Sequence, residues 1–190
     1  MLLADKLDLL PKIVVELGMG DGRVLESLAK ADSRSLHVGI ELNAEQCTQV
    51  KSRIRLDNII VMNGSFEEII PHLPDNGIDR FVAVLPDPSY IEEQKENHWR
   101  PLYSQVYRKL KPNGTFQLIA ELTDELLQPV SDSQYSKWIA WLKSTFTSLG
   151  FSIADMQEGA PAHYSTRCLD QFRGDPMRIR IVTIEFVKNA

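Results

Sequence analysis

The fold is decided by the stretch Ile13-Val14-Val15-Glu16-Leu17-Gly18-Met19-Gly20-Asp21-Gly22. Its first five residues form an apolar run closed by glycines, which predicts a buried strand over 13–17. Residues 23–30 place their apolar side chains on one helical face and predict a helix. Three glycines at alternate positions between strand and helix permit a tight turn and let a ligand approach the helix N-terminus. The stretch therefore predicts a ligand-binding loop, with a plain glycine-rich turn as the alternative.

The spacing of these glycines separates two classes of cofactor. A dinucleotide fingerprint needs Gly-x-Gly-x-x-Gly, whereas this loop is Gly-x-Gly-x-Gly. Glu16 agrees with a cofactor that lacks a pyrophosphate, because its carboxylate attracts the amino group of a methionine moiety and repels a diphosphate. Glu41 ends a strand predicted over 36–42 and lies 23 residues after Gly18, where an acid can accept hydrogen bonds from ribose hydroxyls. Loop and acid together predict a nucleoside cofactor.

Strand-like and helix-like segments alternate along the rest of the chain. This order predicts an α/β fold with a mostly parallel sheet and helices on both faces. The last two strands are joined by a loop with no clear helix, so the final strand is expected to be antiparallel. Further strands are predicted over 58–62, 80–85, 115–120, 151–156 and 178–187, helices over 44–55 (capped by Asn43), after Ser65, over 99–110 and over 135–149, a loop over 86–97 and a turn over 111–114.

Length and composition indicate an ordinary soluble protein with one domain over residues 1–190. No apolar run approaches the ~20 residues of a membrane span, and the charged segment Met1–Leu10 is not expected to be a signal peptide. Two cysteines and four scattered histidines predict neither a disulfide framework nor a metal site. We therefore expect a cytoplasmic protein without metal or membrane partner. The net charge of -5 argues against non-specific binding of nucleic acid.

At this point the residues resemble the class I S-adenosylmethionine-dependent methyltransferases. Residues 16–22 are similar to their first motif, Glu41 to their ribose-binding acid, and residues 62–66 lie where that superfamily contacts adenine, although many members have an acid at the position of Ser65. The resemblance implies a Rossmann-like, seven-stranded sheet with an antiparallel last strand, and S-adenosyl-L-methionine as the cofactor. The residues that it implies for cofactor binding are Glu16, Gly18, Met19, Gly20, Gly22, Glu41, Leu42, Ser65, Phe66 and Leu85.

The segment Leu85-Pro86-Asp87-Pro88-Ser89-Tyr90 follows the fourth predicted strand and resembles two families. Bacterial-type tRNA (guanine-N7)-methyltransferases carry Pro-Asp-Pro there, and exocyclic-amine methyltransferases carry Asp/Asn-Pro-Pro-Tyr/Phe. In either family Asp87 is the catalytic candidate, accepting a hydrogen bond from a nucleobase N–H, with Pro88 and Tyr90 beside the substrate. A turn whose aspartate faces water is the alternative.

Two later segments favour the guanine-N7 family. Residues 122–124 resemble its Thr-Asp and residues 164–167 its C-terminal Thr-containing segment, which implies that Thr123, Asp124, Thr166 and Arg167 line the acceptor side. Two departures stand against it. Residues 89–96, with three Glu and one Lys and hence a charge of -2, replace a Trp and a basic run, which removes contacts to an RNA backbone. Leu169 occupies the position of a family Glu, although Asp170 could substitute for it.

Two other groups of residues have competing interpretations. Arg167, Arg173, Arg178 and Arg180 form either the solvated face of a strand and its flank or an anion-binding patch. Trp138 and Trp141 are expected to pack in the core.

The function predicted is methyl transfer from S-adenosylmethionine to a nucleobase nitrogen, with guanine N7 of tRNA as the leading target, although the acidic charge and the missing basic run weaken tRNA as a partner. One alternative is an exocyclic-amine or small-molecule methyltransferase that uses residues 87–90. Another is a non-catalytic binding subunit that retains the fold.

Overall fold

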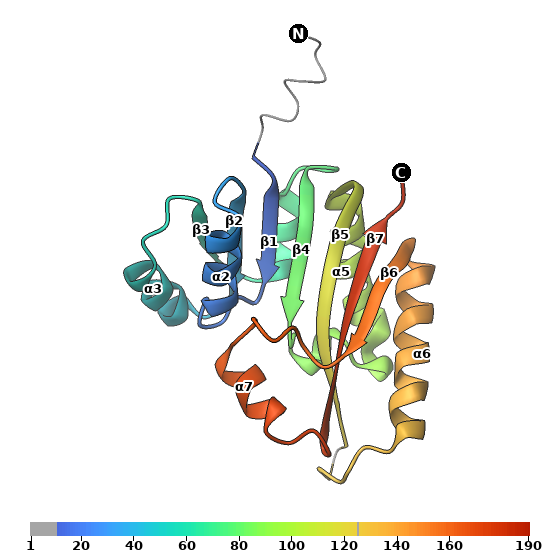
Figure 1. Cartoon of the computed structure of the whole chain (residues 1–190). Helices are drawn as coiled ribbons and strands as arrows, with labels where there is room; N and C mark the ends of the chain where they lie inside the picture. The colour runs from blue at the N-terminus through green and yellow to red at the C-terminus, as the bar shows by residue number, and fades with distance from the viewer. Residues whose placement is uncertain (1–10, 125) are drawn as a thin grey trace.

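The computed structural model describes residues 11–124 and 126–190, and Met1–Leu10, which carries the expectation about a signal peptide, lies outside them. Seven strands form one sheet (Figure 1). The strands are β1 Ile13–Leu17, β2 Leu36–Glu41, β3 Ile59–Asn63, β4 Ile78–Val84, β5 Leu110–Thr123, β6 Phe151–Glu158 and β7 Ile179–Lys188. The α-helices are α2 Arg23–Ala31, α3 Ala44–Arg53, α4 Phe66–Ile69, α5 Glu96–Lys109, α6 Asp132–Ser148 and α7 Arg167–Arg173, and the 3-10 helices are η1 Ile70–His72, η2 Pro88–Tyr90 and η3 Glu93–Lys95.

The strand order is β3-β2-β1-β4-β5-β7-β6. The pairs from β3 through β5 are parallel, whereas β7 runs antiparallel to both β5 and β6. This arrangement confirms the Rossmann-like methyltransferase fold with an antiparallel last strand. The strand order reverses between β1 and β4, and the carboxyl ends of parallel strands at such a reversal are where open α/β sheets bind ligands.

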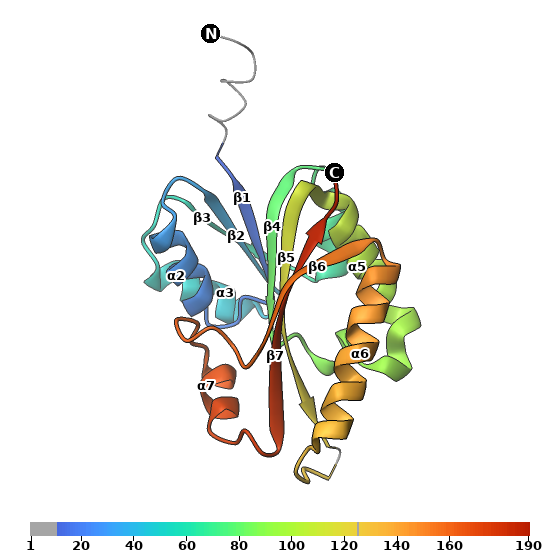
Figure 2. The same ribbon diagram turned by 45° about the vertical axis from the view of Figure 1, so that its right-hand side comes forward.

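Helices cover both faces of the sheet (Figure 2), and the side chains packed beneath them differ between the two faces. On the side of α5 and α6, aromatic rings fill the core, and Trp99, Tyr103, Phe116, Phe146 and Phe186 are buried there. Trp138 and Trp141 pack against this cluster as expected. On the opposite side, α2, α3 and α7 pack over smaller aliphatic clusters.

The predicted helix starts at Asn43 and Ser65 are confirmed by their caps. The Asn43 side chain accepts hydrogen bonds from the backbone N–H groups of Glu45 and Gln46, at 2.9 and 3.1 Å. Ser65 and Glu68 form a reciprocal capping box. These side chains satisfy amide groups that have no partner inside the helix, which is why the helices begin there.

The structure corrects three expectations about local structure. The loop between the last two strands contains α7, capped by Thr166 and held by the buried Leu169; seven residues are too few to show a helical period in the sequence. Residues 111–114 lie within β5 rather than in a free turn, and the register with β4 shifts there, with Asn113 at a φ of 63°. Helices α5 and α6 begin at Glu96 and Asp132, each three residues before the predicted start.

Candidate functional site

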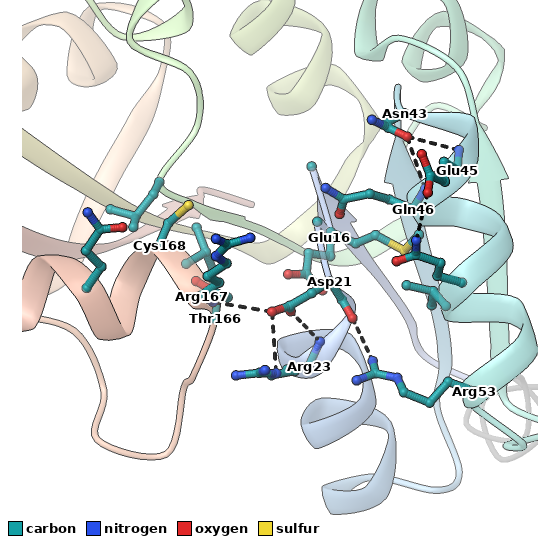
Figure 3. A pocket seen from close by; sticks show the side chains of 18 residues that line it. Glu16, Asp21, Arg23, Asn43, Glu45, Gln46, Arg53, Thr166, Arg167 and Cys168 are labelled. Carbon is teal, nitrogen blue, oxygen red and sulfur yellow. Dashed lines mark hydrogen bonds and ion pairs between the residues drawn. The ribbon is translucent and has the colours of Figure 1, made fainter.

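A cavity of about 830 Å³ lies at the carboxyl ends of β1 and β4, and we call it the cofactor cavity. Its walls come from the loop after β1, from α3 and from α7, as Figure 3 shows. Of the residues predicted to bind the cofactor, Glu16, Gly18, Met19, Gly20 and Leu85 line it. Its volume is in the range of pockets for drug-sized ligands.

The glycine loop owes its shape to backbone conformations that other residues rarely adopt. Gly18 and Gly22 both have a φ of 70°. A Cβ on Gly18 would lie 3.3 Å from the ring of Phe66, and one on Gly22 would lie 2.9 Å from Val50 of α3. Gly22 therefore allows α2 to start tightly against α3, and it lies outside the cavity lining.

Glu16 is the most informative side chain of the cofactor cavity. It is 1% exposed, and its Oε2 has no hydrogen-bond partner among the described residues. Burial raises the pKa of its carboxyl well above the usual value; the charges of Asp21 and Glu41 add to the shift, and a backbone hydrogen bond at Leu25 opposes it. Gln46, in the same lining, also has a buried Oε1 without a partner in the described part of the chain. A cationic, hydrogen-bonding ligand group would remove the cost of both.

Such a group is the ammonium of the methionine moiety of S-adenosylmethionine. The residues present therefore fit this cofactor: a buried carboxylate oxygen and a buried amide oxygen without partners among the described residues, and a loop of glycines at positive φ.

The other residues predicted for the cofactor lie around this cavity rather than in its lining. Glu41 accepts hydrogen bonds from the backbone N–H of Gly20 (3.0 Å) and of Asn43 (2.8 Å), which ties the glycine loop to the start of α3. Leu42 is 69% exposed. Ser65 caps α4, and the Phe66 ring lies against Gly18. Their contacts to ribose and adenine stay predictions.

The side of the cofactor cavity opposite α3 is formed by α7. Thr166 and Arg167, predicted for the acceptor side, line this cavity. The carboxylate of Asp21 accepts a hydrogen bond from the backbone N–H of Arg167 at 3.3 Å, and Arg53 donates to the backbone carbonyl of Asp21 at 2.6 Å (Figure 3). Asp21 thus joins α3, the glycine loop and α7. The position of Asp21 inside the glycine loop could have identified it as a site residue from the sequence. The contribution of α7 to the cavity could be seen only in the fold.

Asp87 is exposed and caps η2, just after β4. Its Oδ1 accepts hydrogen bonds from the hydroxyl (2.6 Å) and the backbone N–H (2.9 Å) of Ser89, and these bonds hold the pKa of the carboxyl below its usual value. Asp87 is therefore ionised at neutral pH and suited to accept hydrogen bonds rather than to remove a proton from a weak acid. Leu85 lines the cofactor cavity and Pro88 lines a second one, so Asp87 lies on the chain between them.

The second cavity, of about 720 Å³, lies among η3, the end of β5 and α6, and we call it the α6 cavity. The predicted residues Pro88, Thr123 and Asp124 line it. Glu121 also lines it; this residue belongs to no motif and directly follows the strand predicted over 115–120, so nothing in the sequence singled it out. The structure therefore divides the predicted acceptor residues between two cavities.

Tyr90, Leu169 and Asp170 line neither of the two cavities. The Tyr90 ring packs edge-on against Phe66, with centroids 5.3 Å apart, and burial and a hydrogen bond to Glu67 raise its pKa to about 12. Leu169 is buried under α7. Asp170 accepts a hydrogen bond from Ser165 at 2.7 Å and lies outside the lining of the cofactor cavity.

The arginine cluster is mostly structural. Arg173 donates to the backbone carbonyls of Tyr164 and Pro161, at 2.7 and 2.6 Å. Arg178 pairs with Asp175. Arg180 pairs with Asp132 and Glu158 and lies 4.0 Å from the centre of the Tyr135 ring. These contacts favour the strand-face interpretation over an anion-binding patch.

Within residues 11–124 and 126–190, no helix has the length and apolar character needed to cross a membrane. In the same part of the chain, no group of three or more His, Cys, Asp or Glu side chains could hold a metal ion.

Comparisons with known proteins identify the family. A family model described as "Putative methyltransferase" matches residues 11–158. The tRNA (guanine-N(7)-)-methyltransferase of Chlorobium phaeobacteroides is 30% identical over 163 residues, covering 82% of this chain and 72% of the relative. The protein of the same description from Campylobacter fetus subsp. fetus is 34% identical over 110 residues, covering 56% of this chain, and the aligned part spans only 28% of that relative.

Among solved structures, the 16S rRNA methyltransferase KamB has the same fold, with a TM-score of 0.73 at 14% identity over 100% of this chain and 95% of that one. The chain therefore belongs to the methyltransferase family whose model matches residues 11–158, as a divergent S-adenosylmethionine-dependent member.

Proposed function

We propose that this protein transfers a methyl group from S-adenosylmethionine to N7 of a guanine in tRNA. The observation that carries this proposal is that Asp87, in Pro86-Asp87-Pro88, stands in the chain between Leu85, which lines the cofactor cavity, and Pro88, which lines the α6 cavity. An acceptor base held by Asp87 would lie beside the cofactor. The relatives described as tRNA (guanine-N(7)-)-methyltransferases support the choice of base and of RNA.

The residues of the cofactor cavity have distinct roles in this proposal. Glu16 holds the ammonium of the methionine moiety, since the buried Oε2 of its carboxylate lacks a partner among the described residues. The backbone of Gly18, Met19 and Gly20 forms the surface against which the cofactor lies. Glu41 takes the ribose hydroxyls with the lone pairs that its bonds to Gly20 and Asn43 leave free.

The chemistry asks for positioning rather than for a strong base. The N7 lone pair of guanine forms a bond to the methyl carbon while the carbon–sulfur bond breaks, and the products are a thioether and a cationic purine. Because N7 carries no proton, the protein must align the base and stabilise its developing positive charge. Ionised Asp87 does both when it accepts a hydrogen bond from the N–H edge of the base.

The charge around Asp87 limits how an RNA can approach. Residues 89–96 carry three Glu and one Lys, and this negative charge repels phosphate groups. We therefore expect the target base to enter with its phosphates directed away from η2 and η3.

The position of Tyr90 bears on the exocyclic-amine alternative. Stacking of this ring on the target base would require it to face the acceptor cavity. The ring instead packs edge-on against Phe66, with centroids 5.3 Å apart. This packing favours the guanine-N7 proposal.

The test is incubation of the protein with methyl-labelled S-adenosylmethionine and, separately, bulk tRNA, rRNA or a small-molecule extract. We expect label in tRNA and, after digestion to nucleosides, in 7-methylguanosine. Label in another base, or only in small molecules, would show that guanine N7 of tRNA is not the methyl acceptor. Micromolar cofactor binding without transfer to any fraction would favour a non-catalytic subunit.

A further inference from the structure

Glu121 is a half-buried carboxylate in the α6 cavity that the proposed function does not use. Strand β5 continues beyond the end of β4, where the backbone N–H of Leu85 donates to the carbonyl of Ile119 at 2.8 Å. Glu121 follows two residues later, next to the loop that carries Asp87. Its Oε2 is buried and has no hydrogen-bond partner in the described part of the chain. An unmade hydrogen bond at a buried carboxylate is costly, so this group points to a ligand that supplies N–H donors.

Tryptophan side chains form another wall of the same cavity. Trp141 is held in place, since its indole N–H donates to Glu96 at 3.3 Å and its ring packs edge-on against Trp99. Trp138 lies one helical turn earlier, beside Tyr135, and lines the cavity as well. A fixed, half-buried aromatic surface is what a planar nucleobase stacks on.

The charges in the lining favour a base and disfavour a phosphate. The charged groups that surround Glu121 are Asp87 before η2, Glu92 and Glu93 at η3, Asp124 after β5 and Lys137 on α6. Carboxylates outnumber the lysines even when Lys95, which pairs with Glu92 at 2.6 Å, is added to the set. These carboxylates repel phosphate groups. They also stabilise the positive charge that a purine gains when its N7 is methylated, and the face of an indole ring stabilises the same charge.

We propose that the α6 cavity receives the acceptor guanine, with Glu121 accepting a hydrogen bond from its exocyclic 2-amino group, Asp87 accepting from N1–H, and Trp138 against the ring. The assignment rests on the proposed function, because a guanine acceptor supplies both donors on one edge. Burial raises the pKa of Glu121 to about 7, and the negative charge of Asp87 adds to the shift. Such a shift is expected where two carboxylates lie close enough to bind the same edge of a base.

Inosine lacks the 2-amino group and is otherwise the same purine nucleoside, so the ratio of guanosine to inosine affinity reports this one hydrogen bond. Both can be titrated by quenching of tryptophan fluorescence in the presence of S-adenosylhomocysteine. We expect the native protein to bind guanosine about tenfold more tightly than inosine, the usual effect of a hydrogen bond to a charged group. Glu121→Leu should bind both equally, and Glu121→Gln, which keeps a carbonyl acceptor, should restore part of the preference.

The matched control is Glu185→Leu, which removes a half-buried carboxylate of β7 outside both cavities and should keep the native ratio. An unchanged guanosine preference in Glu121→Leu, or no measurable quenching by guanosine in the native protein, would overturn the assignment.

Transfer of methyl label to tRNA, measured on the same variants, separates the two proposals. Guanine-N7 methylation of tRNA together with an unchanged preference in Glu121→Leu would leave the function standing and remove Glu121 from it. No methylation of tRNA, with the preference lost in Glu121→Leu, would keep the guanine cavity and end the tRNA assignment.

Discussion

The two cavities differ in how the chain builds them. In the cofactor cavity, Glu16, Gly18 and Gly20 are close neighbours in the sequence, and their geometry follows from one strand, one loop and the next helix. In the α6 cavity, Pro88, Glu121 and Trp138 come from three segments that are far apart in the sequence. A local motif therefore specifies the cofactor, whereas the acceptor site depends on how distant segments pack.

The largest effect is expected from Asp87, which stands in the chain between Leu85 of the cofactor cavity and Pro88 of the α6 cavity. Asp87→Ala should lower kcat by at least about 100-fold, the scale for loss of a group that orients the reacting atoms. Affinity for S-adenosylmethionine should change less than about twofold, since Asp87 lies outside the lining of that cavity. Steady-state kinetics and calorimetric titration of the cofactor measure the two. Asp87→Asn keeps an oxygen for the bonds to Ser89 and controls for the shape of the loop. A large loss of cofactor affinity would instead show that Asp87 contributes to the cofactor site.

The next effect concerns Glu16, on the cofactor side. Glu16→Gln should weaken cofactor binding about tenfold or more, because it removes the negative partner of the ammonium. It should also stabilise the ligand-free protein at pH 8. The pKa of Glu16 is raised in the folded state, so its contribution to stability is greatest at low pH and falls as pH rises through the unfolded and then the folded pKa.

Thermal unfolding without ligand should show the Tm of Glu16→Gln higher by about 2–4 °C for each kcal/mol gained. A lower Tm, or unchanged cofactor affinity, would mean that Glu16 has a structural partner rather than a ligand.

A smaller effect, of about tenfold, should appear as pH dependence on the acceptor side. The carboxylate of Glu121 must be ionised to accept a base N–H, and its pKa is raised to about 7. The KM for the guanine acceptor should therefore rise about tenfold between pH 8 and pH 6, with little change in the KM for the cofactor. In Glu121→Gln the titration should disappear. If the KM of the native protein for the guanine acceptor did not change between pH 6 and pH 8, Glu121 would have no part in base binding.

The smallest effect is expected for the arginines that the sequence gathers near its end. Arg178 pairs with Asp175 at the surface, and such pairs contribute about 0–1 kcal/mol. Arg178→Ala should change the KM for a tRNA acceptor less than about twofold and barely alter the Tm. An increase in KM of tenfold or more would restore the anion-binding interpretation and add this flank of β7 to the acceptor side.

Much of the fold could be predicted because its signals are local. The alternation of strands and helices and the caps at Asn43 and Ser65 follow from short-range patterns, and the structure confirms them. The antiparallel last strand is also confirmed, although the loop before it contains the helix α7, which the prediction had left out. The helix α7 could not be predicted in this way. Its seven residues are held by the burial of Leu169 and by contacts to the glycine loop, and neither leaves a period in the sequence.

The cofactor loop could be recognised from its residues alone, because alternating glycines and a carboxylate beside them are properties of neighbouring residues. Which distant residues join them depends on the fold. The backbone N–H of Arg167 donates to Asp21 across 146 residues, and this contact holds α7 at the cofactor cavity. Glu121 became a candidate only when the end of β5, η3 and α6 enclosed it, because burial and the lack of a partner depend on packing rather than on residue type.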